Sequence, residues 1–577
     1  MAKLEIRRPQ LTEVFGVGAV YDAPGMSLMI SQAGWTYERT LEVAEPRLVL
    51  RLRVDSLRTP RPDGEGRVPA RRFPSWCHCP VCGMLRKAAS VGPVNRPTVC
   101  PNRNCGGVAM LPTRLIIACS HGHIDDFPWF NWAHARSTCT LNGDQNRLKL
   151  VSSSKSTAFS DLRVVCTCGA SNSLEGVLLP GALAGIGAHA CTGAAPWAGP
   201  GITEVCGDRE VKVLQRGASN VYFPIRDGAV SIPPYSGVAY QVANKIWASM
   251  SVLEPGDAVW SVFVARHAKA NNLQPEELEE ALAVKRREVS GLALTDDIKL
   301  DEFAALAHPP QGTGFRDHYH AVKAGVPQPH RTWLKEVTLV KRLRFVTALR
   351  GFSRIEYSTD ENRMRKTEMV FEGKRWMLAN EVRGEGIFLQ LDEAKVAAWL
   401  ANNRPQIEAR LSALLPRARV NQMVARTELP ARAETILLHT LSHMVIAELA
   451  LESGYSASSI RERLYCLTDA AGTANRLGIL IYTSTSDSEG SLGGLVRQGA
   501  PERLEGLLDR AIESARWCSN DPLCAEVDTV AGQGTGGLNL AACHCCSLLP
   551  ETSCELFNVM LDRTLLVGGK GFPSFIS

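Results

Sequence analysis

The chain carries the stretch CPVCGMLRKAASVGPVNRPTVCPNRNC (Cys79–Cys105), in which two short cysteine pairs flank residues 83–99. Each pair closes a small turn that directs two thiolates at one ion, and two such turns make a tetrahedral four-sulfur zinc site with no open position. The spacing therefore predicts a zinc-ribbon-like module with the ligands Cys79, Cys82, Cys100 and Cys105. A closed site of this kind holds a small module together and leaves no place for a substrate.

The remaining cysteines fall into two separate regions. Of the 18 cysteines, eleven lie between Cys77 and Cys206 and seven between Cys466 and Cys554. The sequence starts without an apolar leader or cleavage site, so it predicts a cytoplasmic protein. In a reducing compartment thiolate metal ligation is favoured over disulfides. We therefore expect metal-rich regions on both sides of a cysteine-free middle.

Two further sites follow from cysteine spacing, which brings the expected number of structural Zn²⁺ ions to two or three. One is expected from Cys166, Cys168, Cys191 and Cys206. The other is expected from Cys543, Cys546, Cys554 and either Cys518 or Cys524. In the second set the short pair Cys543-x2-Cys546 is the clearest zinc-binding signal. The sequence leaves open whether Cys518 or Cys524 is the fourth ligand.

Length and hydrophobic patterning predict a mixed α/β, multidomain protein. The 577 residues suggest several domains. We expect a β-rich segment at 1–65, a zinc-rich region at 66–215, a mixed α/β middle region at 216–428 and an α/β zinc-binding domain at 429–577. Gln274–Val289 is expected to be a helix, with Pro275 at its start and acids before bases. The last domain should contain a long helix closed by Gly454, followed by the buried strand LGILIYTST. Apolar runs such as LGILIY are too short to cross a membrane.

The basic excess of the chain is concentrated in one strip. Residues 331–375 contain twelve Lys and Arg against six Asp and Glu, an excess of +6, whereas the whole chain carries +5. Such a strip is typical of a surface that neutralises DNA phosphates, although a solvated helix face gives the same count. The candidate phosphate contacts are Lys341, Arg342, Arg344, Arg350 and Arg354.

The sequence CSHGHIDDF (Cys119–Phe127) offers the main alternative, which is a catalytic function. Its H-x-H-x-D-D pattern resembles the metal-binding signature of metallo-β-lactamase-fold hydrolases, and His121, His123 and Asp125 would be the ligands of a metal-dependent hydrolase or nuclease. The final position of that signature is Asp126 instead of His. The competing interpretation is that the two histidines hydrogen-bond locally or assist a neighbouring zinc.

Other catalytic signals are weaker. His439 and His443 are spaced i, i+4 in LLHTLSHMV, which puts both rings on one helix face, but the glutamate of an H-E-x-x-H motif is missing, so a packed or hydrogen-bonded pair is expected. No G-x-x-x-x-G-K-[ST] sequence is present either. The sequence therefore predicts neither a nucleotide-driven motor nor another enzyme.

Several long blocks together resemble one known family. They are IRRPQLTEVFGVGAVYD, RFPSWCHCPVCGML, PTRLIIACSHGHIDDFPWFNWAH, LQRGASNVYFP, VRGEGIFLQLD, LLHTLSHMVIAELALESGYSASSIRERLY, GILIYTSTSDSEGSLGGLV and NLAACHCCSLLPETSCELFNVMLDR. In this order they are similar, nearly end to end, to the DrmB family of the DISARM bacterial anti-phage defence system. From about Ala431 the chain is also similar to a domain of unknown function at the C-termini of MrfA-type DNA-repair helicases.

The resemblance implies a function as well as a fold. It implies a cytoplasmic accessory subunit that forms a heterodimer with DrmA, an SNF2-like helicase, and helps it to bind and sense phage DNA, while a companion methyltransferase marks host DNA. It also implies that the C-terminal cysteine cluster binds zinc. Cys545 is left out of that ligand set because family members carry other residues there.

Overall fold

The computed structural model describes residues 5–62, 66–90, 97–139, 147–152, 158–188, 190–289, 297–310, 316–483, 494–569 and 571–576. The chain forms two compact, discontinuous units. Unit 1 comprises Met1–Val43, Leu52–Asp227 and Thr347–Asn380. Unit 2 comprises Ala44–Arg51, Gly228–Val346 and Glu381–Ser577. The division into four consecutive segments remains a prediction, whereas the mixed α/β, multidomain class is confirmed.

Unit 1 is built from small antiparallel sheets. The first has the order β1 (Val20–Ala23), β2 (Met26–Ile30), β5 (Ala70–Arg72). The second has the order β10 (Ile124–Asp126), β9 (Leu115–Ala118), β14 (Lys212–Gln215). The third has the order β13 (Ser171–Ser173), β12 (Leu162–Cys166), β11 (Leu148–Ser152), β7 (Met84–Lys87), β6 (Trp76–His78), β8 (Leu111–Pro112). Strands this short have little hydrophobic surface of their own, which suits regions held by bound metal.

Other elements complete unit 1. They are α1 (Gln10–Glu13), β3 (Thr40–Glu42), β4 (Ser56–Pro60), α3 (Trp129–Ala133), β18 (Arg365–Lys366) and β19 (Met369–Phe371). The strands β15 (Phe223–Val230), β17 (Leu334–Ser353) and β20 (Lys374–Leu391) supply residues to both units, because the boundaries of the units fall within them.

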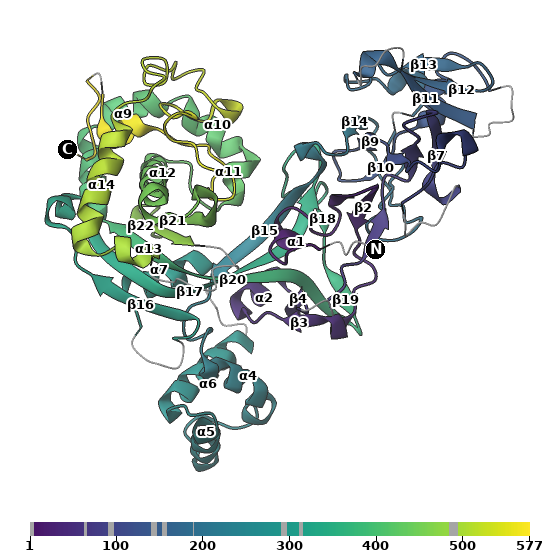
Figure 1. Ribbon diagram of the computed structural model, residues 1–577. Helices are drawn as coiled ribbons and strands as arrows, with labels where there is room; N and C mark the ends of the chain where they lie inside the picture. Colours follow the sequence, from purple (N-terminus) through teal and green to yellow (C-terminus); the bar gives the residue numbers. More distant parts are fainter. Residues whose placement is uncertain are drawn as a thin grey trace. The chain divides into compact units, whose positions relative to one another are not determined.

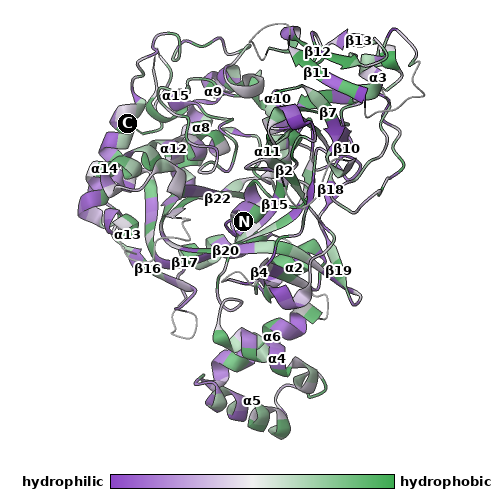
Figure 2. Ribbon diagram, turned by 45° about the vertical axis from the view of Figure 1, so that its right-hand side comes forward, coloured by the Kyte–Doolittle hydropathy of each residue, from purple (hydrophilic) through white to green (hydrophobic). Residues whose placement is uncertain are grey.

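Unit 2 contains a sheet covered by helices. The strand β16 (Tyr319–Ala324) pairs with β17, and β22 (Ala474–Thr483) pairs with both β20 and β21 (Ile460–Thr468). The helix α12 (Ala433–Ser453) packs on β21 and β22, with α14 (Pro501–Ala515) beside it (Figure 1). The helix α14 carries hydrophilic and hydrophobic residues along its length (Figure 2) and buries Leu504, Leu507 and Leu508. Its apolar side therefore meets the core.

Helix α12 confirms the prediction of a long helix closed by Gly454, which adopts the left-handed conformation at φ 72°. It is the one helix among the described residues that is long and apolar enough to cross a membrane. However, 83% of its most apolar window is buried inside the protein. Burial to this extent is typical of the central helix of a folded domain.

The remaining helices of unit 2 include a three-helix bundle with its own apolar core (Figure 1), formed by α4 (Val238–Met250), α5 (Ala258–Ala270) and α6 (Pro275–Val289). The predicted helix Gln274–Val289 is confirmed as α6 (Pro275–Val289). The predicted strand LGILIYTST is confirmed as β22 up to Thr483, and its last two residues lie outside the described residues. The other helices are α2 (Pro46–Leu52), α7 (Ile298–Ala307), α8 (Glu393–Asn402), α9 (Arg404–Leu411), α10 (Leu414–Val420), α11 (Gln422–Arg426), α13 (Gly494–Gln498) and α15 (Arg563–Val567).

Candidate metal centres

The cysteine turns of the opening stretch meet in unit 1. Cys79 follows β6, Cys82 lies in the tight turn before β7, and Cys100 and Cys105 come from the second turn. The Sγ atoms of Cys79 and Cys105 are 3.8 Å apart, and those of Cys82 and Cys100 are 3.7 Å apart. Zinc–sulfur bonds of about 2.3 Å in a tetrahedron place two sulfurs about 3.8 Å apart. The donor set and its spacing therefore fit a closed zinc site.

The structure divides the second predicted site between two different clusters. Cys166 and Cys168 lie with His134 and Cys139, whereas Cys191 and Cys206 lie with Cys119 and His123. The single group of four cysteines expected from the sequence is therefore corrected. The physical reason is the sheet: Cys166 ends β12 of the six-stranded sheet, whereas Cys119 follows β9 of the three-stranded sheet.

In the first of these clusters the orientation of His134 fits metal binding. Its Nδ1 donates to the carbonyl of Phe130 at 2.8 Å, so Nε2 carries the lone pair and lies 3.3 Å from Cys168 Sγ. A histidine fixed through its second nitrogen is typical of metal ligands. Hydrogen bonding from the Ala170 backbone lowers the pKa of the Cys168 thiol to about 6, which favours the thiolate that binds metal.

The second cluster includes His123, the second histidine of the H-x-H-x-D-D motif. His123 Nδ1 lies 3.4 Å from Cys119 Sγ, and its Nε2 lies 3.1 Å from Glu204, which also accepts from Arg365 at 2.7 Å. Cys119 and Cys206 are 3.9 Å apart, again a tetrahedral separation. His123 is thus placed among three cysteine sulfurs.

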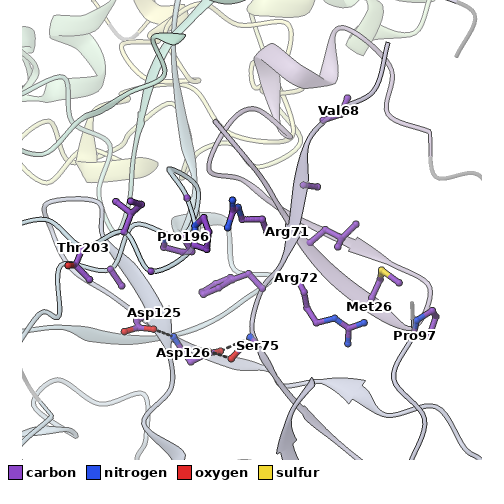
Figure 3. Close-up of a pocket in the computed structure, with 18 of the residues that line it drawn as sticks. Met26, Val68, Arg71, Arg72, Ser75, Pro97, Asp125, Asp126, Pro196 and Thr203 are labelled. Atoms are coloured by element: carbon purple, nitrogen blue, oxygen red, sulfur yellow. Dashed lines mark hydrogen bonds between the residues drawn. The ribbon is translucent and has the colours of Figure 1, made fainter. Parts of the chain in front are cut away.

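His121 lies at the edge of the same cluster, whereas the two aspartates have other partners. His121 Nδ1 lies 3.6 Å from Cys206 Sγ and 3.7 Å from Asp208. Asp125 accepts from the Thr192 hydroxyl at 2.9 Å. Asp126 accepts from the backbone and hydroxyl of Ser75 (Figure 3). The arrangement that a hydrolase would need, with His121, His123 and Asp125 sharing one ion, is therefore not the arrangement seen here. The motif supplies one ligand to a cluster of cysteines.

Asp125 and Asp126 also line a pocket of unit 1 that has a volume of about 990 Å³. Arg71 and Arg72 line the same pocket (Figure 3), and most of the remaining lining is apolar. Burial raises the pKa of Asp126 to about 6, and the hydrogen bonds from Ser75 partly offset that rise. The pocket is amphipathic, with acidic and basic groups in its wall.

The third predicted site is also rearranged. Cys518, Cys524, Cys543 and Cys546 lie together in unit 2, so both open candidates join the cluster and Cys554 does not. The Sγ separations are 3.6 Å for Cys518–Cys543 and 3.8 Å for Cys524–Cys546. Cys545, the residue left out of the predicted set, is exposed. The neighbouring Cys524 thiol lowers the pKa of Cys546 to about 5, which favours the thiolate.

Cys554 instead lies against the histidines of α12. His439 Nε2 is 3.1 Å from Cys554 Sγ, and both histidines are buried. Burial lowers the pKa of His439, which keeps its ring neutral at pH 7. The pair is packed and hydrogen-bonded, as the sequence suggests, but its surroundings include a cysteine and a glutamate that spacing alone does not reveal.

Four of the five candidate phosphate contacts lie on β17, not on a helix, and Arg354 directly follows that strand. Part of this basic strip is buried. Arg354 is 1% exposed and donates to the carbonyls of Gly18, Gly122 and Val221 within unit 1. Arg344 is 5% exposed and pairs with Glu381 in unit 2. These two residues are therefore corrected from phosphate contacts to internal structural cations. Lys341 and Arg342 are exposed, and Arg350 is half-buried.

Three ligands of the two mixed clusters, Cys119, His134 and Cys139, were not predicted from the sequence. The spacings Cys119-x3-His123 and His134-x4-Cys139 are the signals that could have identified them. A short turn can direct a cysteine and a histidine at one metal ion, just as it directs two cysteines.

The assignment of Cys168 and Cys191 to different clusters gives a quantitative prediction. We expect Cys168→Ser and Cys191→Ser each to remove one zinc equivalent, and the double variant to remove two. Metal content of the purified full chain, measured by plasma mass spectrometry, checks this. Cys77→Ser is the control, since Cys77 is buried beside the Cys79 turn and contacts the carbonyl of Arg86 instead of the cluster. Loss of only one zinc equivalent from the double variant would instead indicate that Cys168 and Cys191 bind the same ion, as the sequence predicted.

Comparisons with known proteins agree with this geometry. The family model "MrfA Zn-binding domain" matches residues 441–547, which include Cys518, Cys524, Cys543 and Cys546. Zn²⁺ is therefore the cofactor that these donor sets fit. A second family model, "Domain of unknown function (DUF8724)", matches residues 7–223.

One solved structure, described as the crystal structure of DUF1998 helicase MrfA bound to DNA, matches 35% of this chain at 10% identity and a TM-score of 0.17. The chain spans about a fifth of that helicase, 21% of its length. The DISARM protein DrmB of Bacillus paralicheniformis (strain ATCC 9945a / NCIMB 11709 / CD-2) is 30% identical over 475 residues, which cover 79% of this chain and 80% of the relative. The chain belongs to the DrmB family of DISARM proteins.

Proposed function

We propose that the chain is a non-catalytic accessory subunit of a DISARM defence complex in the cytoplasm. It pairs with an SNF2-like helicase of the DrmA type and helps that partner to bind and sense foreign DNA. The observation that carries the proposal is the relationship to DrmB over most of both chains. The clusters with four cysteines support it, because a four-sulfur shell leaves no coordination position for a substrate.

The non-catalytic part of the proposal has a direct test. Nuclease assays with Mn²⁺ or Zn²⁺ compare the full chain with His123→Ala, which alters the H-x-H-x-D motif. We expect no metal-dependent cleavage by either protein. If the wild type cleaves DNA and His123→Ala does not, the chain is a metal-dependent hydrolase or nuclease and not a non-catalytic subunit.

A basic surface of unit 2 supports a contribution to DNA binding. Lys341 and Arg342 are exposed on β17, and the β16 residue His320 pairs with Arg342 in the sheet. Burial lowers the pKa of His320, and the charges of Arg316, Lys341 and Arg342 lower it further. Positive charge is therefore concentrated here, although Arg342 also pairs with Asp317 at 3.1 Å. Such a surface attracts phosphates through Coulomb forces and counterion release.

We expect Lys341→Ala/Arg342→Ala to weaken DNA binding by the helicase complex without changing its stability. Loss of two phosphate contacts should reduce the slope of log K against log salt by about 2. Fluorescence anisotropy with labelled duplex DNA at several salt concentrations measures that slope. The control is Lys395→Ala/Arg404→Ala, which removes two exposed cations from the helices α8 and α9 of the same unit. An unchanged slope in the Lys341/Arg342 variant would show that this surface does not contact DNA phosphates.

A further inference from the structure

A buried group of metal-binding side chains lies at the centre of unit 2, apart from the four-cysteine cluster. His439 and His443 come from successive turns of α12, Glu462 from β21 and Cys554 from the C-terminal loops. The side chains of both histidines and of Glu462 are 0% exposed, and Cys554 is 8% exposed. The i, i+4 spacing places the two imidazoles on one helix face, with ring centroids 4.3 Å apart. Four donor atoms therefore converge inside the protein.

Both histidines present their Nε2 atoms to this group. His439 Nδ1 donates to the carbonyl of Met560 at 3.3 Å, and His443 Nδ1 donates to the carbonyl of Ser547 at 2.7 Å. A carbonyl only accepts, so in the neutral ring each Nε2 carries a lone pair. This second-sphere arrangement orients metal-binding histidines in proteins.

Two of the converging atoms have no hydrogen-bond partner. His443 Nε2 and Glu462 Oε2 are buried and unpartnered, while Glu462 Oε1 accepts from the backbone of Glu555 at 2.9 Å. Burying a lone pair and a carboxylate oxygen without a partner costs about 1–3 kcal/mol each, and more for a charged group. A cation bound by His443 Nε2 and by the Glu462 carboxylate would offset both losses.

The separations between the histidine nitrogens and Glu462 fit a shared metal better than ion pairs. His439 Nε2 lies 3.1 Å from Cys554 Sγ and 3.3 Å from Glu462 Oε1, and His443 Nε2 lies 3.6 Å from that oxygen. A charge-assisted N–H···O bond is about 2.7–2.9 Å long. Zinc bonds to nitrogen and oxygen of about 2.0–2.2 Å in a tetrahedron put these donors about 3.3–3.5 Å apart, close to both histidine–glutamate separations. The His439–Cys554 separation is shorter and would widen by about 0.4 Å around a zinc ion.

We propose that His439, His443, Glu462 and Cys554 bind a zinc ion in addition to the one held by Cys518, Cys524, Cys543 and Cys546. Two neutral imidazoles, one carboxylate and one thiolate offset the charge of a divalent cation, which suits a site without solvent. The ion would join α12, β21 and the C-terminal loops. Two of its ligands, His439 and Cys554, lie outside residues 441–547, the segment matched by the zinc-binding family model.

Ser547 connects this site to the four-cysteine cluster. Its carbonyl accepts from His443 Nδ1, and its hydroxyl donates to Cys546 Sγ at 3.3 Å. Ser547 therefore lies in the second coordination sphere of both ions. Filling one site would help to orient a ligand of the other.

The test uses the wild-type full chain and requires no variant. Anomalous diffraction at the zinc edge is expected to show a peak between His439 Nε2, His443 Nε2 and Cys554 Sγ, separate from the peak among the four cysteines. Absence of that peak, in crystals where the four-cysteine peak is present, would overturn the proposal.

Metal content in solution gives a second readout. We expect the double variant His443→Gln/Cys554→Ser to contain one zinc equivalent fewer than the wild type. The control is Cys466→Ser, which alters a buried cysteine of β21 outside the proposed site and should leave the zinc content unchanged. A folded double variant with unchanged zinc content would also overturn the proposal. The diffraction experiment still decides the question if the double variant does not fold. Neither experiment depends on DNA binding or on the helicase partner.

Discussion

We expect Cys546→Ser to lose one zinc equivalent and to unfold the zinc-binding part of unit 2 at a temperature at which the wild type is folded. Cys546 shares a cluster with Cys518, Cys524 and Cys543. Structural zinc contributes about 10–16 kcal/mol in small metal-dependent domains, which is comparable to the whole stability of a domain. Loss of one thiolate should therefore cost about 5 kcal/mol or more and lower the melting temperature by roughly 10–20 °C.

The adjacent residue provides a matched control for this prediction. Cys545 is exposed and lies outside the cluster, so Cys545→Ser removes a thiol from the same loop without removing a ligand. Calorimetry and zinc content should be close to those of the wild type. Equal melting temperatures for the Cys545 and Cys546 variants would contradict a stabilising role for the four-cysteine site.

The second large effect is expected at Arg354 in unit 1. Its guanidinium donates to the carbonyls of Val221, Gly18 and Gly122 at 2.6, 2.8 and 2.9 Å and lies over the ring of Phe352. Arg354→Met keeps much of the side-chain volume but leaves three buried carbonyls without donors. Each loss costs about 1–3 kcal/mol, so we expect unit 1 to be destabilised by about 3 kcal/mol or more.

Two companion variants make the Arg354 prediction specific. Arg354→Lys retains a cation but not the planar set of donors, so it should restore only part of the stability. Arg342→Met removes an exposed arginine of β17, the strand that Arg354 follows, and should change stability by less than about 0.5 kcal/mol. Chemical unfolding followed by fluorescence measures all three. If Arg354→Met were as stable as the wild type but bound DNA more weakly, Arg354 would be a phosphate contact and not a structural cation.

The metal centres show which part of a site the sequence reveals. The pairs Cys79-x2-Cys82 and Cys543-x2-Cys546 are local, because a short turn alone brings their thiolates together. The partners of Cys166 and Cys191 are set by the sheets to which the flanking strands belong, and spacing does not encode that choice. Cys554 is close in sequence to Cys546, yet its position against α12 depends on tertiary packing.

The basic strip shows a different limit. A count of charges over residues 331–375 identifies an excess but gives no direction for individual side chains. The strand β17 exposes Lys341 and Arg342 and buries Arg344, and Arg354 is buried directly after the end of the strand. By contrast, α12 and β22 were predictable, because long apolar patterns and a closing glycine are strong local signals. The resemblance to the DrmB family was carried by whole blocks of sequence and agrees with the relationship to the DISARM protein.

The accessory role itself is tested most directly by one binding measurement. The DNA affinity of the purified DrmA-type helicase is measured at fixed salt with and without this chain, with duplex and single-stranded DNA. We predict that the complex binds at least one of these DNAs more tightly than the helicase alone. We also predict that the Lys341→Ala/Arg342→Ala chain gives a smaller increase. Equal affinity for both DNAs with and without the chain would contradict the proposal that it contributes to DNA binding.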